Sequence, residues 1–88
     1  ALRIGLVTRI VPEGGALDAA LGMARGLAAG PRVAFGYMKR NLLAAETLGV
    51  AEMLDYEALH QVRTGLTEDF REAAQAFAAK RPPVFRGR

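Results

Sequence analysis

The chain has 88 residues, a formal net charge of +3 and no cysteine. This length fits one small domain or part of a larger one, and the lack of cysteine excludes a disulfide framework and a Cys-based zinc site. No apolar run approaches the roughly 20 residues of a membrane span, and no signal peptide opens the chain, so we expect no membrane association and a cytoplasmic location. The chain begins at Ala1 rather than Met, and we expect the natural start to lie upstream.

The positive charge is concentrated at the C-terminal end. Residues 1–79 contain eight Lys and Arg residues against nine Asp and Glu residues, whereas residues 80–88 contain four basic residues and no acid. A positive field over the whole chain would favour nucleic acid, and a short basic tail favours it less strongly. We therefore expect no nucleic acid partner.

The first recognisable element is Ile4–Val11, a β-branched run that ends at Pro12. This pattern predicts a β-strand. The rest of the chain offers no second strand, and one strand cannot satisfy its own backbone N–H and C=O groups. We therefore expect the partner strands to lie outside the 88 residues, in another chain or in a longer parent protein.

Four helices are predicted after this strand, because apolar residues recur there at the spacing of one helical face. Glycine, often beside proline or threonine, separates them. The fold class is thus mainly α, with one N-terminal β-strand plus four helices. The predicted helices are Ala16–Ala29, Pro31–Thr47, Val50–Arg63 and a terminal helix that begins after Thr67 and ends before Pro82.

The terminal helix has the clearest signals. Thr67 is a good N-cap, and Glu68 and Asp69 place negative charge in the first turn, where the helix dipole favours it. Pro82 and Pro83 are expected to stop the helix. One apolar face is predicted to be buried, and it consists of Phe70, Ala73, Ala74, Phe77 and Ala78.

Catalytic and metal-binding patterns are missing from the sequence. His60 is the only histidine and there is no serine, so neither a histidine cluster for a metal nor a Ser-His-Asp triad can form. We expect His60 to be solvated or capped, and we assign no catalytic and no metal-binding residue. Two acid pairs at helical spacing are expected to lie on solvated faces; they are Glu52 with Asp55 and Glu68 with Glu72.

Phe77 and Lys80 are the one pair that could bind a ligand. They are three residues apart and share a helical face. The aromatic ring could pack on a purine base while the ammonium meets a phosphate. From the spacing alone, a Phe77 in the core and a Lys80 that interacts with the helix dipole are favoured over a ligand site.

The order of motifs along the chain resembles the C-terminal part of the enoyl-CoA hydratase/isomerase (crotonase) superfamily. Each motif is weak, but the ordered series is specific, and the likeness covers essentially the whole chain. The motifs are IGLVTRIVP at residues 4–12, LAAGP at 27–31, Lys39, Glu57-Ala58 with Gln61, Thr67-Glu68-Asp69, Arg71-Glu72, Ala76-Phe77, and KRPPVF at 80–85 with Gly87.

The resemblance implies a larger parent built as a spiral of ββα turns, followed by a helical region that forms a trimer or a dimer of trimers. It implies that residues 1–12 are the last strand of the missing core, that residues 13–80 are the helical C-terminal region, and that residues 81–88 are a basic tail. The oxyanion hole and the catalytic carboxylates of the family belong to the core, so the 88 residues alone are not expected to catalyse a reaction.

The resemblance also implies binding residues. Phe77 matches the family's aromatic residue beside the adenine of coenzyme A, and Lys80 matches the cation near its phosphates. Coenzyme A is then part of the acyl-CoA substrate, and no tightly bound cofactor is expected. Ala73 departs from the glycine that the family often has there. Phe35, Tyr37 and Met38 could border the acyl pocket, although core packing is favoured for them.

Two other functions stay open at this point. The chain could be a small helical binding module whose basic tail docks on nucleic acid or an acidic partner. It could also be a structural helical oligomer with no ligand.

Overall fold

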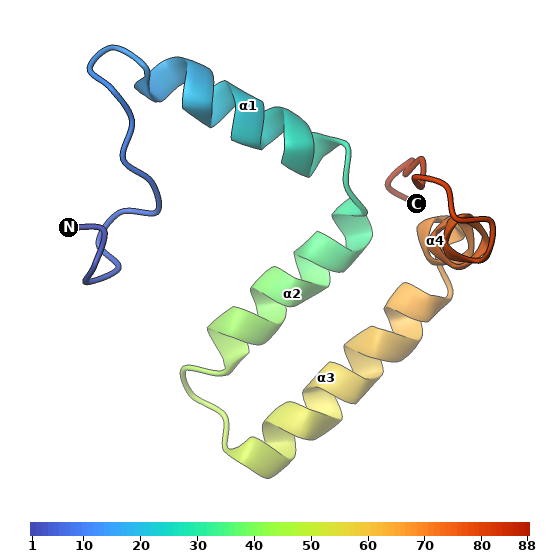
Figure 1. Ribbon diagram of the computed structural model, residues 1–88. Helices are drawn as coiled ribbons and strands as arrows, with labels where there is room; N and C mark the ends of the chain where they lie inside the picture. The colour runs from blue at the N-terminus through green and yellow to red at the C-terminus, as the bar shows by residue number, and fades with distance from the viewer.

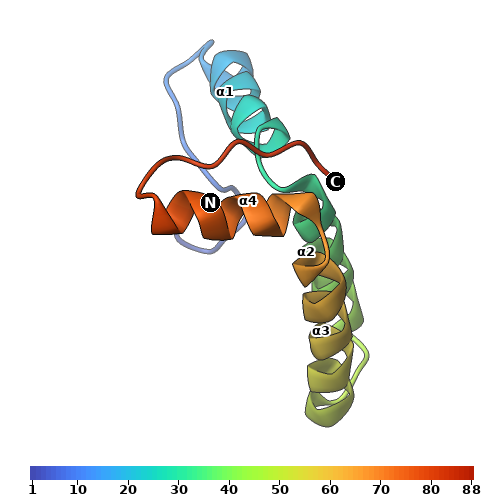
Figure 2. The same ribbon diagram turned by 90° about the vertical axis from the view of Figure 1, so that its right-hand side faces the viewer.

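The computed structural model describes all residues, 1–88, and contains four α-helices and no β-strand. α2 and α3 lie side by side as an antiparallel hairpin, α1 extends away from the start of α2, and α4 crosses the end of α3 (Figures 1 and 2). The prediction of four helices is confirmed, with ends that differ by a few residues. The helices are α1 (Ala16–Ala28), α2 (Arg32–Ala44), α3 (Val50–Gly65) and α4 (Glu68–Ala78).

The predicted strand at Ile4–Val11 is wrong. This segment forms turns and irregular chain. Within it only the amides of Gly5 and Leu6 donate hydrogen bonds to backbone carbonyls, and the accepting carbonyls belong to Leu2 and Ala1. Ile4 and Leu6 are 73% and 75% exposed. A β-branched run needs a neighbouring strand to complete its ladder, and these 88 residues supply none.

Local signals explain where the helices begin and turn. The Thr67 hydroxyl accepts a hydrogen bond from the amide of Phe70 at 3.1 Å, which confirms the predicted N-cap of α4. The turn between α1 and α2 favours glycine, because a side chain at Gly30 would force the ring of Phe35 to move. None of the four helices is long and apolar enough to cross a membrane.

The apolar faces that the sequence predicts as buried are exposed in this chain. One residue from each face illustrates this: Leu17 of α1 is 69% exposed, Leu42 of α2 73%, Val50 of α3 80% and Phe77 of α4 87%. Ala76 is the one fully buried apolar residue. The helices therefore touch through other side chains, and their main apolar faces have no partner within the 88 residues.

The contact between α2 and α3 is centred on His60, so the prediction of a solvated or capped His60 is wrong. Its ring is buried and lies between the rings of Tyr37 and Tyr56, with centroids 4.5 and 4.3 Å away. Its Nδ1 is hydrogen-bonded to the side-chain oxygen of Asn41 at 2.5 Å. His60 is thus a core residue of the hairpin.

Burial lowers the pKa of His60 below its ordinary value of 6.5, and the positive charges of Arg63 and Arg40 lower it further. The Arg40 guanidinium lies 5.5 Å from the centre of the Tyr37 ring. Protonation of His60 would place a third positive charge beside two others, so the folded hairpin favours the neutral imidazole.

The molecule is flat and open. Its principal dimensions are 43 × 38 × 19 Å and its radius of gyration is 16.5 Å, whereas a compact domain of this length would have a radius of gyration of about 12 Å. Its accessible surface is 7260 Å², against roughly 5,000 Å² expected for a folded monomer of this mass. The helices thus form a thin layer with two uncovered sides.

Candidate functional site

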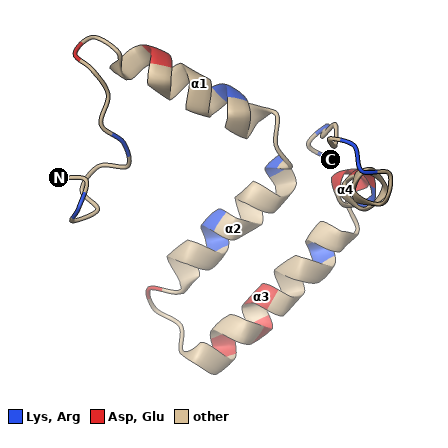
Figure 3. Cartoon of the chain, in the orientation of Figure 1, with Lys and Arg blue, Asp and Glu red and all other residues tan.

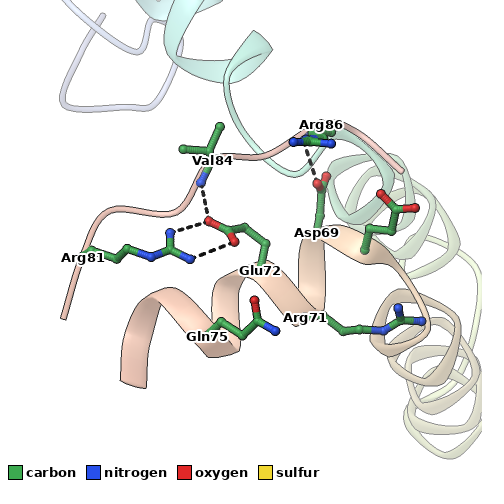
Figure 4. A pocket seen from close by; sticks show the side chains of 8 residues that line it. Asp69, Arg71, Glu72, Gln75, Arg81, Val84 and Arg86 are labelled. Atoms are coloured by element: carbon green, nitrogen blue, oxygen red, sulfur yellow. Dashed lines mark hydrogen bonds and ion pairs between the residues drawn. The ribbon is translucent and has the colours of Figure 1, made fainter. Parts of the chain in front are cut away.

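The tail, residues 81–88, folds back over α4 and runs antiparallel to it (Figures 2 and 4). Three acidic residues of α4 hold it, and Figure 3 shows the acidic side of α4 next to the basic tail. A groove of about 370 Å³ remains between α4 and the tail. Its lining is mostly polar and comprises Glu68, Asp69, Arg71, Glu72, Gln75, Arg81, Val84 and Arg86.

Glu72 is the central contact of this arrangement. Its two carboxylate oxygens accept hydrogen bonds from the Arg81 guanidinium at 2.6 and 3.0 Å, and one of them also accepts from the amide of Val84 at 2.9 Å. The bond to Arg81, then that to Val84, lowers the pKa of Glu72 from 4.5 to about 2. Pro82 and Pro83 have no N–H, so Val84 carries the first amide after Arg81 that can bind the carboxylate.

Asp69 holds the end of the tail. Its side chain is buried and accepts hydrogen bonds from the amides of Arg86 at 2.7 Å and Gly87 at 2.8 Å, while its own amide donates to the carbonyl of Arg88 at 3.0 Å. Gly87 has φ +77°, and a side chain there would collide with the guanidinium of Arg32. Arg32 itself donates to the carbonyl of Arg86 at 2.9 Å, which ties the start of α2 to the tail.

The prediction that Glu68 and Glu72 lie on a solvated face holds for Glu68, which is exposed, and is wrong for Glu72. Glu72 binds the tail, and Glu68 forms an exposed ion pair with Arg88 at 2.9 Å. The other pair, Glu52 and Asp55, is exposed as predicted. Periodicity within α4 could not show this, because the partners lie 9 to 20 residues further along the chain.

Phe77 and Lys80 lie together at the C-terminal end of α4. The amide of Lys80 donates to the carbonyl of Phe77 at 3.1 Å, and the amide of Arg81 donates to that of Ala76 at 3.0 Å, the hydrogen bonds of a Schellman turn. The helix thus ends at Ala78, ahead of the two prolines expected to stop it. Both side chains are exposed, so the placement of Phe77 in a core is wrong for this chain.

Lys80 has φ +51°, the left-handed conformation that glycine adopts at this position of most such turns. It is the one residue other than glycine with a positive φ. A side chain in this conformation costs about 1–2 kcal/mol. Its ammonium forms no ion pair within the chain. Lys80 is therefore strained and has no ion-pair partner within the chain.

The sequence gives little sign that Asp69, Glu72 and Arg32 hold the tail, because the tail lies far from each of them along the chain. The available signal was weak: Asp69 and Glu72 are three residues apart, and so face the same side of α4, while the tail carries charges of opposite sign. No group of three or more His, Asp or Glu side chains is placed to hold a metal ion.

The full length of the chain, residues 1–88, matches the model of the enoyl-CoA hydratase/isomerase family. The chain belongs to this family. It is 36% identical to 1,2-epoxyphenylacetyl-CoA isomerase of Escherichia coli K12 over 84 residues, and this alignment covers 96% of the chain and 32% of the relative. It is 39% identical over 88 residues to a probable enoyl-CoA hydratase of Rhodobacter capsulatus, covering 100% of the chain and 34% of the relative.

Solved structures of the enoyl-CoA hydratase/isomerase family have the same arrangement of helices. A crystal structure of this family from Mycobacterium abscessus superposes with a TM-score of 0.97 at 40% identity, covering 100% of the chain and 34% of that structure. The chain thus spans about a third of the length of the relatives it matches. The open layer of helices is therefore the arrangement that the matched third of that structure has, even though few of its side chains are buried here.

From the sequence, core packing is favoured over an acyl pocket for three further residues, and the structure divides them into two groups. Phe35 and Tyr37 are half-buried, with Phe35 against Gly30 and Tyr37 against His60. Met38 is 56% exposed. Core packing, which the sequence favours for all three, thus holds for the first two.

Proposed function

We propose that the chain is the C-terminal region of an enoyl-CoA hydratase/isomerase-type enzyme, here termed the parent enzyme. In this role it builds the oligomer and borders the coenzyme A part of an acyl-CoA substrate. One observation carries the proposal: Phe77 and Lys80 are both exposed at the C-terminal end of α4, and Lys80 holds a backbone conformation that is costly for lysine.

The chemistry of these two side chains suits coenzyme A. The Phe77 ring, 87% exposed, offers a flat apolar surface for the adenine base. The ammonium of Lys80 offers a cation for the phosphates. Backbone strain that the fold maintains points to a role for the strained residue, and a lysine that must present its charge at this turn is such a role.

The reaction itself is proposed to take place elsewhere in the parent enzyme. Stabilisation of a thioester enolate needs N–H donors aimed at the developing oxyanion and groups that move the proton. We place these in the ββα core of the parent enzyme and assign no catalytic residue within residues 1–88. The chain then contributes to binding of the substrate and leaves the chemical step to the core.

The unpartnered apolar faces support the oligomer-building role. Each helix carries at least one large apolar side chain that is more than two-thirds exposed. Exposed apolar surface beyond a few hundred Å² marks an interface. We propose that the core and neighbouring subunits cover these faces, in a trimer or a dimer of trimers.

The binding module with a free basic tail has no observation in its favour. Glu72 and Asp69 hold the tail through Arg81 and the backbone amides of Val84, Arg86 and Gly87. A tail bound to its own helix in this way is not free to dock along a phosphate backbone.

Replacement of Lys80 in the parent enzyme tests the proposal. Loss of a charge-assisted hydrogen bond to phosphate should make Lys80→Ala raise the KM for an acyl-CoA about tenfold. The KM for the matching acyl-pantetheine, which lacks the phosphoadenosine, should change little. Lys39→Ala is the matched control, because Lys39 is the other lysine and is also exposed. An unchanged KM for both substrates in Lys80→Ala would remove Lys80 from the site.

A further inference from the structure

We propose that Glu72 and Arg81 are positioning residues for Lys80. Their ion pair closes the turn after α4 and fixes the direction in which Lys80 presents its ammonium. This inference rests on the proposed function, since it assumes that Lys80 binds the phosphates of coenzyme A. It adds two residues that touch no substrate.

Lys80 is joined directly to a residue that the fold holds in place. Arg81 follows it directly and is held at two points: its amide donates to the carbonyl of Ala76 at 3.0 Å, and its guanidinium binds both oxygens of Glu72. The backbone that leaves Lys80 therefore cannot rotate without breaking a bidentate ion pair. Figure 4 shows Arg81 reaching back across the turn to Glu72 on α4.

Glu72 also fixes the far side of the turn. The oxygen that accepts from Arg81 at 2.6 Å also accepts from the amide of Val84 at 2.9 Å. The two prolines between these residues restrict the chain to few conformations. Residues 81–84 thus form a loop closed on a single carboxylate, and Lys80 lies at its entrance.

The geometry and partial burial of the Glu72–Arg81 ion pair favour a strong interaction. Most exposed ion pairs contribute little, but bidentate arginine–carboxylate geometry is the favourable exception. The Glu72 side chain is 23% exposed and that of Arg81 44%, so the pair is partly shielded from water. By contrast, the Glu68–Arg88 pair is single, is 57% and 65% exposed, and involves the opposite end of α4. This second pair is a natural control.

The test uses the parent enzyme with Glu72→Gln and Arg81→Gln, which remove the ion pair from either side. Each variant should raise the KM for an acyl-CoA about three- to tenfold, with kcat and the KM for the acyl-pantetheine unchanged. Glu68→Gln should change none of these values. Arg81→Lys keeps the charge but loses the bidentate geometry, and should fall between wild type and Arg81→Gln.

A double-mutant cycle separates positioning from general stability. If Glu72 acts through Lys80, Glu72→Gln should have no further effect on the KM for acyl-CoA once Lys80 is alanine. An additive effect, or an equal rise in KM for both substrates, would overturn the inference and make the pair a structural contact only. A rise in Lys80→Ala with no rise in either pair variant would also overturn it, while leaving the proposed function intact. If Lys80→Ala itself has no effect, the proposed function fails first.

Discussion

At the scale of single residues, Glu72 connects the helix to the tail and does so as a carboxylate. Its pKa of about 2 lies below the ordinary value of 4.5 because the ionised form binds Arg81 and the amide of Val84. The unfolded chain would take up a proton near pH 4.5, whereas the folded chain would take it up only near pH 2. Stability from this residue is therefore complete above pH 4.5 and is lost as the pH falls toward 2.

Acid titration should show this loss directly. We expect the amide of Val84 to become less protected from hydrogen exchange as the pH falls from 4.5 to 2, because protonation of Glu72 breaks the contact. In Glu72→Gln, the protection should be lower at neutral pH and should lack this transition. A transition in the variant equal to that in the wild type would assign the acid sensitivity to other carboxylates.

Substitution of Lys80 should change stability and acyl-CoA binding in opposite directions. Lys80→Gly should raise the free energy of unfolding by about 1 kcal/mol, because glycine adopts the left-handed conformation without the cost of a Cβ. It should also raise the KM for acyl-CoA in the parent enzyme as much as Lys80→Ala does. Alanine pays the same backbone cost as lysine, so Lys80→Ala should not be stabilised. A stabilised Lys80→Gly with full acyl-CoA affinity would contradict the role of this lysine.

At the scale of elements, the tail is secured by backbone geometry as well as by charge. Gly87 has a positive φ and lies against the guanidinium of Arg32, so Gly87→Ala meets both a backbone cost and a collision. We expect the tail to detach more often, by about five- to thirtyfold for a cost of 1–2 kcal/mol.

Trypsin provides the measurement for this variant, because the bond after Arg86 becomes accessible when the tail detaches. Cleavage after Arg86, followed by mass spectrometry, should speed up by that factor in Gly87→Ala. Gly36→Ala is the control, since Gly36 has open space around it and lies within α2. Equal cleavage rates in the two variants would show that Gly87 does not hold the tail.

Among the elements, those that depend on neighbouring residues could be predicted from the sequence, and those that depend on distant partners could not. The spacing of apolar residues and the Thr67 cap are local, and they predict the four helices well. Whether the face that contains Val50 or Leu42 is buried depends on a neighbour that this chain lacks. The strand at Ile4–Val11 was predicted for the same local reasons and is wrong because a strand needs a partner.

The candidate site shows the same division. Phe77 and Lys80 could be proposed as binding residues from their spacing and from the order of motifs along the chain, which resembles the family. The hold of Glu72 on Arg81 could not be proposed in this way, since it arises when the tail returns to α4. Such contacts between distant parts of a chain leave no periodic pattern in the sequence.

At the scale of the whole molecule, the open shape is the central observation. A radius of gyration of 16.5 Å, in place of about 12 Å, and an excess of roughly 2,000 Å² of accessible surface describe an open layer with uncovered faces. The excess is as large as a standard protein–protein interface. We propose that these faces are contact surfaces for other polypeptide.

Sedimentation equilibrium of the 88-residue chain, over a range of concentrations, tests this claim most directly. Without the parent core, the exposed faces should bury one another, and the chain should associate with a mass that rises with concentration above 9.4 kDa. A mass that stays at 9.4 kDa over the whole range, with cooperative unfolding of that monomer, would contradict the claim that the helical layer is an interface.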